Sequence, residues 1–106
     1  MKNTREITMT LIAELPMLTG TEKQIAYAED LRVKRVEADV VGLVNAIERK
    51  RENRGEEAVA AMLEKMGAES EEDYIMKKIK ANKLSAFNAH KELTSAKDVI
   101  EYRVYF

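Results

Sequence analysis

The sequence predicts a mainly α-helical single domain with α+β character at its margins. We expect one long helix, three or four short helices and a small β element. Two observations predict the helices: apolar residues recur at helical spacing through most of the chain, and several hydroxyl residues precede these runs as caps do. The β element is predicted by strict alternation near the N-terminus. At 106 residues, the chain has the length of one domain, 1–106.

Residues 5–15 alternate between apolar and polar side chains, with Ile12 as the exception. One side of the pattern would carry Ile7, Met9, Leu11, Ala13 and Leu15. Period two with threonines on the other side predicts a strand, which Pro16 would end because proline cannot donate to a ladder.

The long helix is predicted from Thr21 to Arg54. Thr21 and Gln24 have the spacing of a capping box, and Gly55 after a basic stretch suits a C-cap. Its apolar positions are Ile25, Ala28, Leu31, Val36, Val40, Leu43, Val44 and Ile47. Such a helix would be about 50 Å long, and Gly42 in its interior marks a possible kink.

Short helices are predicted after the long one. The first spans 56–66 and ends at Gly67, and the next begins after Ser70. Residues 82–93 predict a turn and a weak helix, and Ser95 opens a last helix over 96–103. The alternative for residues 99–106 is a strand that pairs with the first one.

The apolar side of the long helix predicts self-association. The helix over 56–66 is too short to cover the far half of that side, which holds Val40, Val41, Leu43, Val44 and Ile47. An open two-stranded sheet would add unpaired edges. A homodimer would cover both, and it is the commonest closed assembly.

Composition excludes several classes of protein. The charge of −1 argues against a globally basic nucleic-acid binder and against an acidic DNA mimic. The chain has no cysteine for disulfides or thiolate ligands, and no apolar run of membrane-spanning length. We expect a cytoplasmic location and no membrane partner.

Charge is segregated along the chain. Residues 56–73 are acidic, and residues 32–54 and 74–97 are basic. This pattern gives candidate binding residues for a protein or nucleic acid: Arg49, Lys50, Arg51, Arg54, Glu69, Glu71, Glu72 and Asp73. A second interpretation is open for each set, since cations stabilise helix C-termini and acids stabilise helix N-termini.

No pattern indicates catalysis, a metal site or a cofactor. His90 is the only histidine, so no imidazole pair exists for a metal or a proton relay. The sequence has no glycine-rich phosphate loop and no nucleophile elbow. We therefore expect a protein that is not an enzyme.

The stretch Leu18-Thr19-Gly20-Thr21-Glu22-Lys23-Gln24-Ile25-Ala26-Tyr27-Ala28 is the most specific segment. It resembles a motif of uncharacterised small proteins from phages, plasmids and integrated elements of Gram-positive bacteria, which typically read Leu-x-Gly-Ser/Thr-x-Lys-Gln-Ile/Val-Ala-Trp-Ala. Ser95-Ala96-Lys97 with Ile100 and Arg103 resembles their tail more loosely. The motif residues are Gly20, Thr21, Lys23, Gln24, Tyr27, Arg32 and Arg103.

The resemblance implies a genomic context and no chemistry. Accessory proteins of mobile elements often bind host machinery, so by analogy we expect a protein-binding role, with anti-defence (anti-CRISPR-like) inhibition as its sharpest form. The alternatives are a nucleic-acid-binding module that uses residues 32–54, and a self-assembling structural protein. Two interpretations of the motif are open. Its residues cap the helix and pack in the core, or Gln24, Tyr27 and Arg32 recognise a partner.

Overall fold

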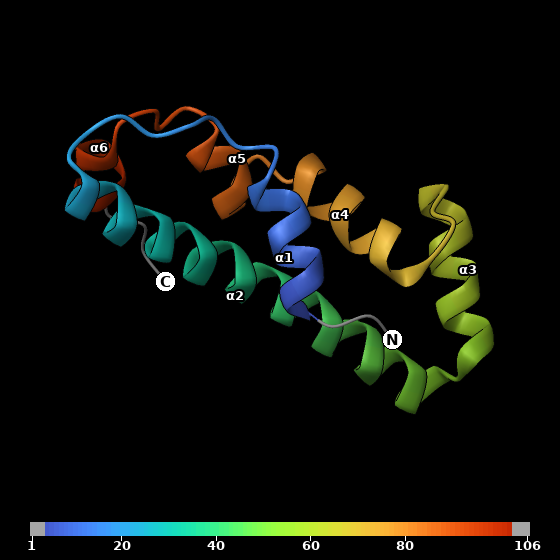
Figure 1. Ribbon diagram of the computed structural model, residues 1–106. Coiled ribbons are helices and arrows are strands. Elements are labelled where there is room, and N and C mark those ends of the chain that lie inside the picture. The colour runs from blue at the N-terminus through green and yellow to red at the C-terminus, as the bar shows by residue number, and fades with distance from the viewer. Residues whose placement is uncertain (1–3, 103–106) are drawn as a thin grey trace.

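The computed structural model describes residues 4–102, in which six helices follow one another. They are α1 (Thr4–Ile12), α2 (Glu22–Arg54), α3 (Glu56–Met66), α4 (Glu71–Ala81), α5 (Ala86–His90) and α6 (Ala96–Glu101). Helix α2 is the long axis of a molecule that measures 49 × 22 × 21 Å. Figure 1 shows α3 turning away at the far end of α2, α4 returning beside it, and α6 reaching its first turns. Helix α1 packs against the middle of α2.

The long helix and its caps are confirmed. The Thr21 hydroxyl accepts from the Gln24 N–H, and the Gln24 side-chain oxygen accepts from the Thr21 N–H, each at 3.2 Å. At the other end, the Gly55 N–H donates to the Arg51 carbonyl at 2.9 Å. The helix continues through Gly42 without interruption.

The predicted strand over 5–15 is wrong, because Thr4–Ile12 is helix α1. Ile7 and Leu11 satisfy both a two-residue period and the i,i+4 spacing of a helix face, and both are fully buried. Met9, which alternation would bury with them, is 45% exposed. The threonines fit the helix because the Thr8 hydroxyl donates to the Thr4 carbonyl, one turn earlier.

The small β element is reduced to one bridge within residues 4–102. Thr19 and Ser95 form an isolated parallel pair, in which the Thr19 N–H donates to the Thr94 carbonyl and the Ala96 N–H donates to the Thr19 carbonyl. Helix α6 occupies Ala96–Glu101, so the strand alternative is wrong for its first residues. Residues 103–106, the rest of that alternative, lie outside the described residues.

The predicted short helices are confirmed within residues 4–102, except that the last one, predicted over 96–103, ends at Glu101. Each has a local reason to start or stop. Gly67, in a left-handed conformation, ends α3. The hydroxyls of Ser70, Ser85 and Ser95 accept N–H groups at the first turns of α4, α5 and α6.

Two separate apolar clusters hold the helices together. The larger joins α1, α2, α3, α4 and α5 around Phe87, Ile75 and Val36. The smaller lies at the start of α2, where Ala28 packs against Ala96 and Val99 of α6.

The apolar side of α2 is covered largely within the chain. Val40 and Ile47 are buried, Leu43 and Val44 pack against the larger cluster, and only Val41 stays 39% exposed. Four of the five residues from which the dimer was predicted are therefore covered fully or partly within the chain. The dimer itself stays a prediction.

Candidate functional site

Arg51 joins three helices at the far end of the molecule. Its guanidinium donates to Glu48 of α2, to Glu56 of α3 and to Glu71 of α4. These carboxylates raise the pKa of Arg51 above its usual value, chiefly through the hydrogen bonds to Glu56 and Glu48. Arg51 is thus engaged inside the protein and is not free to bind a partner.

The acidic candidates lie at and just before the first turn of α4. Asp73 accepts from the Glu69 N–H and pairs with Lys77, and these contacts lower the pKa of the Asp73 carboxyl. Glu71 is held by Arg51. The helix-start interpretation is favoured for Asp73, whereas Glu71 pairs with a residue of α2. Glu69 and Glu72 make no side-chain ion pair within residues 4–102.

Two of the candidate cations, Lys50 and Arg54, line a groove between α2, α3 and α4, which we call the basic groove. Its volume is about 770 Å³. Its lining comprises Lys50, Arg54, Ala58, Ala61, Met62, Glu64, Lys65, Met66, Tyr74 and Lys78. Four side chains are cationic, and within the described part of the chain none of the four forms an ion pair. One acid, Glu64, shares the lining.

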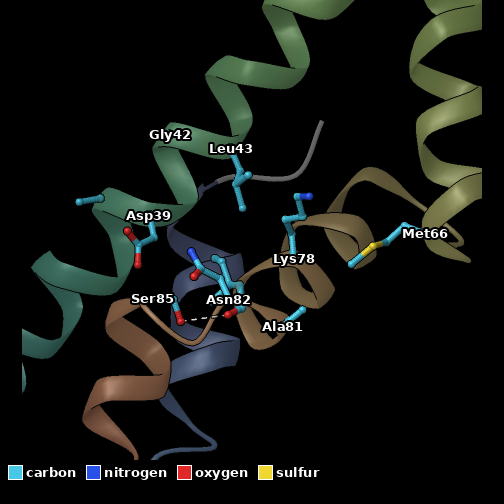
Figure 2. Close-up of a pocket in the computed structure, with 10 residues that line it drawn as sticks. Asp39, Gly42, Leu43, Met66, Lys78, Ala81, Asn82 and Ser85 are labelled. Carbon is cyan, nitrogen blue, oxygen red and sulfur yellow. Dashed lines mark hydrogen bonds between the residues drawn. The ribbon is translucent and has the colours of Figure 1, made fainter.

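A second hollow, which we call the anchor hollow, adjoins the basic groove. It has a volume of about 520 Å³ and lies between α2, α4 and the turn before α5. Its lining is Ala38, Asp39, Gly42, Leu43, Met66, Lys78, Ile79, Ala81, Asn82 and Ser85. Figure 2 shows Met66 pointing from α3 toward α4, with Asp39 and Leu43 on the facing helix. Met66 and Lys78 line both hollows, so the two are adjacent.

The motif residues lie at the opposite end, and the structure brings the two motif stretches together. Gly20 has φ +141°, and a Cβ built there would lie 3.2 Å from the Ala96 Cβ. Arg32 is buried and donates to the Pro16 carbonyl at 2.7 Å and to the Leu93 carbonyl at 2.9 Å. It is a structural residue that closes the loop onto the C-terminal segment.

Thr21 and Gln24 form the capping box, so capping is confirmed for them. Lys23 and Tyr27 are exposed, and Tyr27 is 55% exposed. Arg103 lies outside the described residues.

A buried histidine occupies the same end. His90 is fully buried, and its Nε2 lies 3.3 Å from Arg35, which also donates to the carbonyls of Val99 and Tyr102. Burial first, then the nearby Arg35 and Arg32, lower the pKa of His90 to about 4. The ring is therefore neutral at physiological pH and serves the packing of α5 against α2 and α6.

The candidate basic set is divided by the structure. Lys50 and Arg54 line the basic groove, Arg51 is engaged internally, and Arg49 is exposed outside the groove lining. Lys65, Met62 and Met66 also line the groove, and no partner-binding role was predicted for them. Their i,i+3 and i,i+4 spacing on one helix was the available signal, but the same spacing describes an ordinary core face.

No metal site or membrane span is found in residues 4–102. No group of three or more His, Cys, Asp or Glu side chains is placed to hold a metal ion. None of the described helices has the length and apolar content needed to cross a bilayer. Comparison with protein-family models, curated proteins and solved structures finds no match.

Proposed function

We propose that this protein is a non-enzymatic accessory protein that acts by binding another protein through its basic groove. The observation that carries the proposal is the combination of four cations without ion pairs and an apolar floor of methionine and alanine. Elsewhere in the described chain, Arg51, Lys77 and Lys80 are engaged with acids.

The chemistry of the groove suits a polypeptide. Met62 and Met66 offer flexible, polarisable side chains, which adapt to varied apolar surfaces. The surrounding cations would attract acidic side chains and speed association by long-range steering. An apolar side chain of the partner could bury its surface against these methionines.

The context we propose is a phage or mobile element, with the protein acting in the cytoplasm of its bacterial host. The sequence resemblance supports this context. Inhibition of a host defence system is the sharpest form of the proposal, since small proteins that block a partner surface need only a stable scaffold and a binding face.

A nucleic-acid-binding module over residues 32–54 is the first alternative. Arg32, Arg35 and Arg51 of that segment already have partners inside the protein, which leaves fewer cations for phosphates. A self-assembling protein is the second alternative, and light scattering at micromolar concentration tests it: a clean monomer would contradict it and the predicted homodimer.

The experiment is affinity capture from a host lysate with quantitative mass spectrometry, using the full chain and two double variants. In the first variant, Lys50→Glu and Arg54→Glu reverse charge in the basic groove. In the control, Lys23→Glu and Lys97→Glu reverse the same charge on exposed residues at the other end. We expect the groove variant to lose its specific partner and the control to keep it.

Capture of no protein, together with no effect in a defence-interference assay, would overturn the proposal. Loss of the partner in the control variant alone would transfer the function to the motif end. Binding of duplex or single-stranded DNA whose affinity falls steeply with salt would favour the nucleic-acid alternative.

A further inference from the structure

The partner segment can be specified further from the anchor hollow. We propose that the occupant is an acidic amphipathic helix that places one large apolar side chain over Gly42 and its acidic residues along the basic groove. This inference rests on the proposed function and adds the chemistry and register of the partner.

Gly42 is a glycine that the fold itself does not require. It lies inside α2, and a Cβ built there meets no atom of residues 4–102 within 4 Å. Its φ is not in the range that disfavours other residues. Glycine inside a helix costs up to about 1 kcal/mol relative to alanine. A destabilising residue without a structural reason is expected where another molecule approaches the backbone closely.

The surroundings of Gly42 suit an apolar anchor. Leu43, Met66 and Ile79 line the hollow. Its charged groups are Asp39 and Lys78, and the Asp39 carboxylate accepts from the Ala86 N–H at the start of α5. An incoming leucine or phenylalanine would therefore leave water beside a carboxylate that already accepts one backbone hydrogen bond.

The two hollows set the register of the partner. Lys50 and Arg54 lie on the same helix as Gly42, eight and twelve residues further along. At 1.5 Å per residue, these separations are about 12 and 18 Å along the axis. A helix beside α2 would place acids two to three turns from its anchor residue. Lys65 and Lys78 on the facing helices would flank the same acids.

A helix fits this site better than an extended segment or a phosphate backbone. An added strand needs a free sheet edge, and the β pairing in residues 4–102 is the single Thr19–Ser95 bridge at the other end. A helix satisfies its own backbone groups and recognises side chains. Phosphates would use the cations but would leave the floor around Met62 and Met66 unused.

The test measures binding of synthetic peptides, each about five helical turns long, by fluorescence anisotropy. The first peptide carries leucine along one face and glutamate beside it. A second replaces the leucines by serine, and a third replaces the glutamates by lysine. The protein variants are Gly42→Leu, which fills the anchor hollow, and Gly42→Ala as the matched control. Thermal melting checks that each variant is folded.

We expect only the first peptide to bind, with shifts of the Met66 methyl and Gly42 amide resonances. Gly42→Leu should weaken binding at least about tenfold, the value of one excluded apolar side chain, without a lower melting temperature. Gly42→Ala should leave affinity within about twofold, because one methyl group fills little of the hollow.

Equal binding of the serine peptide, or unchanged affinity of Gly42→Leu, would overturn the anchor inference. The proposed function would then still stand if host-protein capture depends on Lys50 and Arg54. If capture is also insensitive to Lys50 and Arg54, both fail. A dimer that Gly42→Leu disrupts, or duplex DNA that competes for the groove, would overturn the inference by showing another occupant.

Discussion

Arg51 near the end of α2 and Glu71 at the start of α4 form an ion pair across twenty residues of sequence. The pair joins the basic segment to the acidic segment. Glu56 at the start of α3 binds the same guanidinium, so one side chain ties three helices. These ion pairs thus hold the end of α2 to the starts of α3 and α4, the three helices that form the basic groove.

Replacing Arg51 by methionine should lower the melting temperature by a few degrees. The variant loses three carboxylate partners at once and leaves like charges of Glu48, Glu56 and Glu71 close together. Because these groups are partly exposed, the loss should shrink in 1 M salt, where the Debye length is about 3 Å.

The control is Arg49→Met, which removes an exposed arginine with no ion pair in residues 4–102. Differential scanning calorimetry at low and high salt makes the comparison. Equal melting temperatures for both variants would show that the Arg51 network does not stabilise the corner.

Helix ends were predictable because their causes are local. Thr21 with Gln24, Ser70, and the glycines after α2 and α3 each act within one turn. The strand prediction failed because Ile7 and Leu11 fit two periodicities, and only packing against α2 decides between them. Pairing of Arg51 with Glu71 depends on how α3 turns the chain, which no local pattern shows.

Thr21→Ala should cost about 1 kcal/mol of unfolding free energy, as N-cap losses do. The Gln24 N–H loses its acceptor at the start of the longest helix. Thr21→Ser keeps the hydroxyl and should be close to wild type. Urea unfolding followed by circular dichroism measures both variants. Partner capture should be unchanged in each, since Thr21 is remote from the basic groove. Lost capture with an unchanged midpoint would make the motif a recognition site.

Two glycine-to-alanine substitutions should have opposite signs. At Gly20, φ is +141°, and the new Cβ would lie 3.1 Å from the Gln24 side-chain oxygen and 3.2 Å from the Ala96 Cβ. Gly20→Ala should therefore destabilise the fold by at least about 1 kcal/mol. Gly42→Ala adds a methyl group that meets no atom of residues 4–102 within 4 Å, and it should stabilise the helix by up to about 1 kcal/mol.

Chemical unfolding of Gly20→Ala, Gly42→Ala and wild type measures the sign of each change in unfolding free energy. A stabilised Gly20→Ala would show that the approach to Ala96 can relax. A destabilised Gly42→Ala would mean that the fold needs this glycine after all, and the anchor inference would lose its premise.

The candidate site was predictable only in part. Lys50 and Arg54 were identified from the basic end of the long helix, and they do line a groove. Gly42 was interpreted as a kink. In a sequence, a glycine inside a helix looks the same whether the helix bends there or leaves space for another molecule. The fold alone brings Met66 and Lys78 beside it.

Protonation of His90 should destabilise the protein at mildly acidic pH. The folded pKa is lowered from 6.5 to about 4 by burial and by Arg35 and Arg32. Between these values the unfolded state binds a proton that the folded state excludes, so unfolding free energy falls as pH falls. The slope is about 1.4 kcal/mol per pH unit. The stability that comes from keeping His90 neutral is fully present above pH about 6.5 and is lost as pH falls to about 4.

Urea unfolding across this range should show the slope in wild type and a shallower one in His90→Gln, which has no titrating ring. Subtracting the His90→Gln curve from the wild-type curve cancels the pH dependence that comes from carboxylates, which also titrate at the acid end. An imidazole resonance of the folded protein that titrates near its ordinary value of 6.5 would contradict this prediction, because Arg35 and the surrounding apolar groups would then fail to hold His90 neutral.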